Sequence, residues 1–359
     1  MYFQYALIFL FGLIGGLGAF WIGAPMPFLL GGILGSAGFV LFYERGGRRL
    51  PKLSRWVRLV FMSIIGTMIG SRFSPELLSL LPHFWISGLA IIPFILIAHG
   101  GSYAIMRLLG RYEPRDAYYA ALPGGIVDSI ALAEHAGADL RVVTAQHFIR
   151  IILVVTSVPF LFLLIQGDAV GSLAGETMTT ANYDLKDIIL IVVIAIVGLL
   201  LGRLIRLPVS HMMGPLLFAL ILSVWGVIEI DVPPWLAHLA QYMIGTALGA
   251  QFSGMSRRLL AKGLGIGVVV GGYMLLLGAV MAAILTQFVP ADFGVLFVSF
   301  TAGGLAEMSL IALSLNFNPV VVALHHLGRI FLTIWMGSLM AKHIFGFAKS
   351  PSTDPATKE

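Results

Sequence analysis

The chain has 359 residues, of which 58% are hydrophobic and 11% are charged. An ordinary soluble domain has about 45–50% apolar and roughly 25% charged residues, so this composition excludes a water-soluble fold. The formal net charge is +5, and the absence of cysteine excludes disulfides, thiolate metal sites and thiol nucleophiles.

The first half of the chain alternates long apolar segments with glycine, proline and basic residues. A helix of about 20 apolar residues spans a bilayer, so these segments predict membrane helices. No basic leader or cleavage site precedes the first one, which is therefore expected to be a retained helix and not a signal peptide. The predicted helices cover 5–20, 28–43, 57–71, 83–109 and 141–166, with a broken segment over 117–138 that contains Pro123-Gly124-Gly125.

The second half repeats this order after a polar stretch. Its predicted helices cover 187–205, 211–228, 236–252, 263–288 and 318–345, with breaks at Pro208 and at Gly303-Gly304 inside a segment over 293–315. We therefore expect four parts: a membrane repeat over 1–166, a polar extracytoplasmic linker over 167–186, a second membrane repeat over 187–346, and a disordered cytoplasmic tail over 347–359.

The two halves also match residue by residue. The segments Ile65–Ser74 and Ile244–Ser253 share six identities in ten positions at an offset of 179. The same offset pairs the two Gly-Gly breaks, whereas an offset of 183 pairs Pro25 with Pro208. Self-similarity at a fixed spacing is the signature of internal duplication, so the chain is predicted to hold two copies of one helical unit.

The Lys and Arg count predicts how the copies lie in the membrane. If each half makes five crossings and its Gly-Gly segment is re-entrant, 17 of the 22 Lys and Arg residues fall on one side. Six crossings in each half would move the basic loops at 203–206 and 257–262 to the other side, so the positive-inside rule favours five. An odd number of crossings inverts one copy relative to the other, as in many secondary transporters. The predicted fold is thus an all-α polytopic membrane protein with two inverted-topology repeats, each having about five transmembrane helices and one broken or re-entrant Gly-Gly segment.

Three types of ionisable residue recur at matched positions around the breaks. A carboxylate follows each Gly-Gly pair, and a His and an Arg lie three residues apart on the next helix, where they share one face. Charges at membrane depth are costly and normally face a cavity or a partner, so these residues are the candidate site. The candidate ligand-binding residues are Arg150, Arg329, His147, His326, Gly124, Gly125, Gly303 and Gly304, and the candidate ion-coupling residues are Asp128 and Glu307.

Two interpretations of these charges compete. In the functional one, Arg150 and Arg329 hold an anionic group with the help of N–H groups at the breaks, and Asp128 or Glu307 binds a coupling proton or sodium ion. In the structural one, Asp128–Arg150 and Glu307–Arg329 are buried ion pairs that fix helix packing. Taken singly, the two histidines are more typical of packing residues than of ligands.

The sequence predicts no metal or other cofactor, because its nine histidines include no close His-x-His or His-x-x-His pair. The basic residues lie in short loops, where they set topology, so no direct nucleic-acid contact is expected. The expected partners are a lipid bilayer and a small-molecule ligand, and a homo-oligomer is left open.

The paired segments resemble those of the bacterial membrane AbrB family, which is defined by a duplicated membrane domain. The motifs that carry the resemblance are Pro25–Gly35, the pair Ile65–Ser74 and Ile244–Ser253, and Leu122–Asp128 followed by Arg150. Family members are named as regulators of gene expression or as ammonia monooxygenases, and the resemblance supplies no established ligand residue. Because the chain has no soluble domain that could bind DNA, any regulation is expected to be indirect.

The leading hypothesis is therefore a non-enzymatic secondary transporter or exporter of a small anionic metabolite. It is expected in the bacterial cytoplasmic (inner) membrane as a multi-pass protein, with its basic loops and C-terminus in the cytoplasm. A second hypothesis is a membrane-embedded sensor that regulates gene expression without transport. A weaker third one is a monooxygenase-type membrane enzyme.

Overall fold

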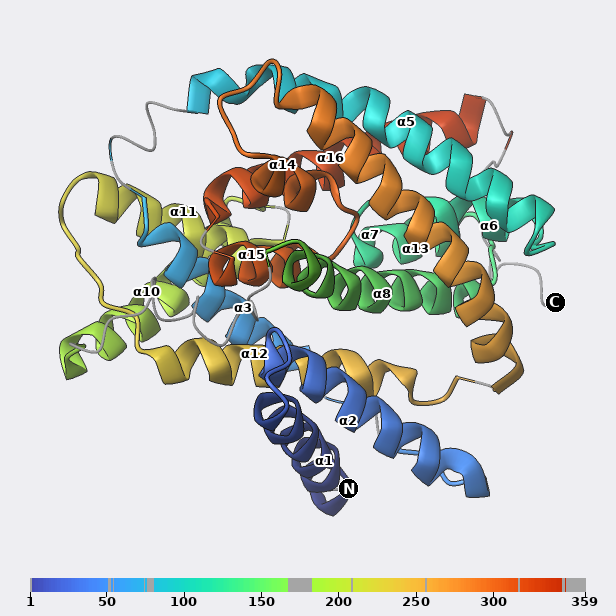
Figure 1. Cartoon of the computed structure of the whole chain (residues 1–359), viewed down its shortest axis with the longest axis horizontal. Coiled ribbons are helices and arrows are strands. Elements are labelled where there is room, and N and C mark those ends of the chain that lie inside the picture. Colours follow the sequence, from blue (N-terminus) through green and yellow to red (C-terminus); the bar gives the residue numbers. More distant parts are fainter. Residues whose placement is uncertain are drawn as a thin grey trace, which may run out of the picture.

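The computed structural model of the chain describes residues 2–50, 53, 55–73, 75, 81–166, 183–207, 209–255, 257–315, 317–343 and 346. Over these residues the protein is all-helical (Figure 1). Six of the described helices are long and apolar enough to cross a membrane. Large apolar side chains on them, such as Leu10, Leu89 and Ile196, are exposed on the outer surface, where lipid tails would cover them. The chain is an α-helical multi-pass membrane protein.

The helices of the two halves correspond in order and in position. The first half contains α1 (Tyr2–Trp21), α2 (Pro27–Tyr43), α3 (Arg55–Gly70), α5 (Trp85–Leu108), α6 (Pro114–Ala121), α7 (Ile126–His135) and α8 (Leu140–Gln166). The second half contains α10 (Leu185–Leu204), α11 (Ser210–Val224), α12 (Pro234–Gly249), α13 (Arg257–Leu285), α14 (Phe293–Phe300), α15 (Leu305–Ser314) and α16 (Pro319–His343). Short 3₁₀ helices lie at Glu44–Gly46, Leu81–Phe84 and Ala250–Phe252.

The ends of matched helices follow the two sequence offsets. Both ends of α1 and α10 are 183 residues apart, and both ends of α3 and α12, of α6 and α14, and of α7 and α15 are 179 residues apart. Met26 and Val209, which also lie 183 residues apart, precede α2 and α11 with positive φ angles of 45° and 48°. The predicted break near Pro25 is thus a short turn between α1 and α2. Pro208, most of the predicted linker and almost all of the tail lie outside the described residues.

Glycines at matched positions allow helices from different halves to touch through their backbones. A Cβ atom on Gly66 of α3 would meet the carbonyl oxygen of Met212 on α11, and one on Gly245 of α12 would meet that of Leu29 on α2. The next glycines along, Gly70 and Gly249, make equivalent contacts with α11 and α2. This small-xxx-small spacing is the one that lets membrane helices approach closely. It gives the repeated Ile-Gly-Thr segment a structural role in joining the halves.

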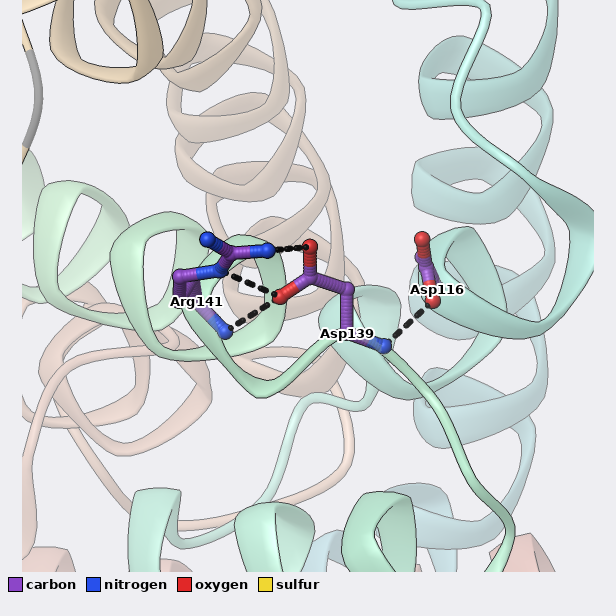
Figure 2. Close-up of polar contacts among 3 residues, drawn as sticks. All are labelled: Asp116, Asp139 and Arg141. Atoms are coloured by element: carbon purple, nitrogen blue, oxygen red, sulfur yellow. Dashed lines mark hydrogen bonds and ion pairs between the residues drawn. The ribbon is translucent and has the colours of Figure 1, made fainter.

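Each Gly-Gly segment folds back on itself as a pair of short helices. The backbone N–H of Asp139, after α7, donates to Asp116 Oδ1 in the first turn of α6 at 2.8 Å (Figure 2). Arg141 in turn donates to Asp139, which holds the pKa of this exposed carboxyl below its usual value. In the second half, a Cβ on Gly294 at the start of α14 would meet the ring of Phe317, which follows α15. The two ends of each segment therefore lie close together. The first helix of each segment, α6 or α14, has eight residues and extends only about 12 Å.

Contacts between loops group the helix ends into two sets. In the first set, the end of α2 lies beside the residues after α12, because Glu44 accepts hydrogen bonds from Ser253 and from the N–H of Gly254. In the second set, Ser223 at the end of α11 donates to the carbonyl oxygens of Ser71 and Phe73, which follow α3. The basic loops also contact one another, since Arg203 lies over the ring of Trp56 and Lys262 lies over the ring of Tyr112.

We predict that enlarging the glycines at the crossings destabilises the protein. The substitutions Gly66→Val and Gly245→Val should each lower the free energy of unfolding by about 1–3 kcal/mol or more, because the added methyl groups must push two backbones apart. Apparent unfolding temperatures of the purified protein in detergent would measure this. Gly18→Val is the control, because this exposed α1 glycine has no atom within 4 Å of an added Cβ. Equal effects at all three positions would contradict the proposed packing role.

Candidate functional site

The two breaks leave backbone carbonyl groups without helical partners, and an arginine binds them in each half. Arg150 Nη1 on α8 donates to the carbonyl oxygen of Leu122 at 2.8 Å. Arg329 on α16 donates from Nη1 to Thr301 at 2.9 Å and from Nη2 to Gly303 at 3.0 Å. Both arginines are 3% exposed. Unpaired carbonyls are costly where water is absent, so these charge-assisted bonds stabilise the interrupted helices.

The structure forms neither of the ion pairs considered from the sequence. Among the residues that the structure describes, the ion pair present is Arg141–Asp139, with 3.2 Å between nitrogen and oxygen. The structural interpretation of Asp128–Arg150 and Glu307–Arg329 is therefore wrong in its choice of partner. Each arginine does have a structural contact, but the acceptors are backbone carbonyls of the neighbouring break.

The two histidines are packed behind the breaks. His326 Nδ1 accepts a hydrogen bond from Arg329 Nη2 at 2.8 Å, and its Nε2 lies 3.0 Å from the carbonyl oxygen of Val298. An arginine can only donate, so His326 is the neutral tautomer with its proton on Nε2. His147 Nδ1 lies 3.0 Å from the carbonyl oxygen of Val143. Both side chains are fully buried, and neither lines the cavity described next.

Both breaks meet at one cavity of about 230 Å³. Its wall contains both Gly-Gly pairs, together with Asp128, Glu307 and Arg329. Residues 179 positions apart in the sequence thus lie around one space. Of the predicted site residues, Arg150, His147 and His326 do not line the cavity.

The carboxylates lie over the glycines that precede them. Asp128 and Glu307 are each the third residue of a helix, α7 and α15. A Cβ on Gly125 would lie 2.8 Å from Asp128 Oδ2, and a Cβ on Gly304 would meet Glu307 Oε2. The space beside the second glycine of each pair is therefore occupied by the carboxylate. The positive end of the helix dipole favours a negative charge at this position.

Three polar residues of the wall were not singled out as site residues from the sequence. Arg58 lies near the start of α3, and Ser210 and His211 begin α11. None of the three belongs to the repeated pattern of a carboxylate, a His and an Arg around the Gly-Gly breaks. Nothing in the local sequence distinguishes them, because they come together through contacts between α3 and α11, such as the glycine crossings at Gly66 and Gly70.

Comparison with known proteins confirms the family resemblance. A family model described as "Transition state regulatory protein AbrB" matches residues 28–345. The protein "Putative regulator AbrB" of Escherichia coli (strain K12) is 25% identical over 355 residues, which cover 97% of this chain and 99% of that protein. "Uncharacterized protein YhjN" of Bacillus subtilis (strain 168) is 25% identical over 304 residues, covering 78% of this chain and 76% of that protein.

We predict that the two arginines differ in their contribution to stability. Arg150→Ala removes the donor to one carbonyl, whereas Arg329→Ala removes the donors to two carbonyls and to His326. Each buried group left unsatisfied costs about 1–3 kcal/mol, so Arg329→Ala should be the more destabilising. Thermal unfolding in detergent would measure the difference. Arg141→Ala on α8 is the control, since that side chain is 84% exposed. A smaller loss for Arg329→Ala than for Arg150→Ala would contradict the carbonyl-binding role.

Proposed function

The chain belongs to the AbrB family, and we propose that it is a secondary transporter for a small metabolite that carries an anionic group. The observation that carries this proposal is the meeting of both breaks and both carboxylates at one cavity. Broken helices that end at a shared site near the membrane centre are the binding architecture of many secondary transporters. In this proposal, Asp128 or Glu307 binds the coupling proton or sodium ion.

The contacts between helix ends support inverted repeats. The end of α2 lies with the end of α12, whereas the end of α11, the counterpart of α2, lies with the end of α3. Because α3 follows α2 directly, the start of α3 lies with the end of α2 in the first set of helix ends, whereas the end of α3 lies in the second set. The ends of α2 and of its counterpart α11 then lie in different sets, so matched helices would run in opposite directions. The folded-back pairs α6–α7 and α14–α15 fit re-entrant segments, which leave an odd number of crossings in each half.

The basic loops support a cytoplasmic assignment for one side. The contacts of Arg203 with Trp56 and of Lys262 with Tyr112 join loops that the five-crossing arrangement places together. The positive-inside rule assigns this side to the cytoplasm. We infer the bacterial cytoplasmic (inner) membrane from the multi-pass helical fold and the bacterial relatives.

The unequal packing of the two matched turns supports alternating access. The second-half residues 207 and 209–211 line the cavity. Their first-half counterparts at the offset of 183 are Ala24, Met26, Pro27 and Phe28, which do not line the cavity, and Met26 and Pro27 are buried. The cavity therefore borders the turn of one half only. If the second-half turn became closely packed and the first-half turn came to border the cavity, the cavity would become accessible from the other side of the membrane.

A membrane-embedded sensor is the second candidate, because the relative from Escherichia coli is named as a regulator. A sensor would use the same cavity to bind a ligand, but it would not release that ligand across the membrane. Flux therefore distinguishes the two functions.

The crossing number can be tested with single cysteines, since the chain has none of its own. We expect cysteines in place of Glu113 and Glu134 to react with a membrane-impermeant maleimide from the same side of the membrane. Cysteines in place of Asp292 and Asn316 should share the opposite side. Labelling of Glu113→Cys and Glu134→Cys from opposite sides would show that α6–α7 crosses the membrane, and the five-crossing arrangement would be wrong.

Transport can be tested once a thermal-shift screen of metabolites has identified a binder, because a ligand that binds the folded state raises its apparent stability. We expect proteoliposomes to exchange this ligand, and Ser210→Trp to abolish exchange by filling the cavity. Ile221→Trp is the control, because Ile221 lies on the same helix but is 42% exposed. Normal exchange by folded Ser210→Trp would exclude the cavity as the route. Tight binding without flux would favour the sensor.

A further inference from the structure

Glu307 is a buried carboxylate with no partner from another side chain. It is 3% exposed and lines the cavity. Among the described residues, no side chain forms a hydrogen bond or ion pair with it, and it lies beside its own backbone N–H. A buried charge normally requires a partner. Glu307 thus provides an acceptor for a cationic group in the cavity.

The same cavity also contains donors without acceptors. Arg329 also lines the cavity, and its two terminal nitrogens are bonded to backbone carbonyls and to His326, so it adds positive charge to the wall. Arg58 is half-buried in the wall, and no hydrogen bond or ion pair is formed by its guanidinium within the described part of the chain. Arg58 is also the positive group that acts electrostatically on Glu307. These donors provide a site for an anionic group.

We propose that the metabolite is a small zwitterion of the amino-acid type, with its ammonium group bound by Glu307 and its carboxylate bound by Arg58. This inference rests on the proposed ligand-binding role of the cavity. A purely anionic ligand would place a further negative charge beside Glu307 and Asp128 and would compete with Glu307 for the positive charge of Arg58. Asp128, which is only half-buried, then remains for the coupling ion.

The size of the cavity agrees with a ligand of this class. Its volume of about 230 Å³ lies below the roughly 300–1,000 Å³ of pockets that enclose drug-sized ligands. Leu248, Phe148 and Ile151 supply apolar wall beside the charged groups, so the ligand can carry a short apolar side chain.

The test uses the full-length protein in detergent and the common L-amino acids as probes in a thermal-shift assay. For every amino acid that raises the unfolding temperature, the deaminated acid and the decarboxylated amine of the same skeleton are measured as well. We expect at least one amino acid to bind, and both truncated analogues to bind at least about 30-fold more weakly, because each leaves one buried charge unpaired. These measurements use the unmodified chain, so they do not depend on how a variant folds.

Two variants that remove one charge each then assign the groups. Glu307→Gln and Arg58→Gln should each weaken binding of the amino acid by at least about 30-fold. Glu134→Gln and Lys186→Gln, which alter exposed side chains away from the cavity, should leave it unchanged. The inference is overturned if no amino acid binds, if a deaminated acid binds as well as its parent, or if folded Glu307→Gln binds normally.

Failure of this inference and failure of the transport proposal give different results. Proteoliposome uptake of an acid without an amino group, unchanged by Glu307→Gln, would overturn the zwitterion and leave transport standing. Tight amino-acid binding without uptake would overturn transport and support the assignment of the two charged groups.

Discussion

The bond between each buried arginine and the backbone of its neighbouring break is the interaction on which the rest of the site depends. A helix interrupted at membrane depth leaves carbonyl groups that neither lipid nor water can satisfy. Arg150 and Arg329 supply those hydrogen bonds from α8 and α16. With the carbonyl side of the break satisfied, the following helix can begin at the cavity with its positive end facing it. The carboxylates Asp128 and Glu307 occupy that position for the same electrostatic reason.

The position of these breaks depends in turn on contacts between the two halves. Backbone contacts at Gly66 and Gly245 join α3 to α11 and α12 to α2. Through the first of these contacts, Arg58 on α3 and His211 on α11 come to one cavity wall. Neither half could build this wall alone, because each supplies one break and one carboxylate. A structural requirement for close helix packing and a functional requirement for two converging breaks are thus met by the same arrangement.

The sequence predicted the helices, the two breaks and the residues around them, because apolar length and matched spacing are local signals. His147 and His326 were included among the candidate ligand-binding residues, but both lie behind the breaks and outside the cavity wall. The sequence did not predict the acceptors of the arginines, since a backbone carbonyl carries no residue type that could be recognised as a partner. Arg58 and His211 were missed for a different reason. Their proximity depends on a helix crossing between halves, and the positive-inside rule already explained Arg58 as a topological residue.

The two halves differ at matched positions in a way that bears on the proposed transport. Glu307 corresponds to Asp128, so both halves retain a carboxylate, but Arg58 corresponds to Ala237 and His211 corresponds to Phe28 at the same offsets. In an alternating-access cycle, the state described by the structure surrounds the ligand with Arg58, Ser210 and His211. In the opposite state, in which the halves exchange roles, these residues would be replaced by Ala237, Pro27 and Phe28. The carboxylates would contact the ligand in both states, whereas Arg58 would contact it in only one. A ligand bound partly through its anionic group would then have higher affinity on the basic side and lower affinity on the other. Such a difference suits a protein that takes up its ligand from the cytoplasm and releases it outside.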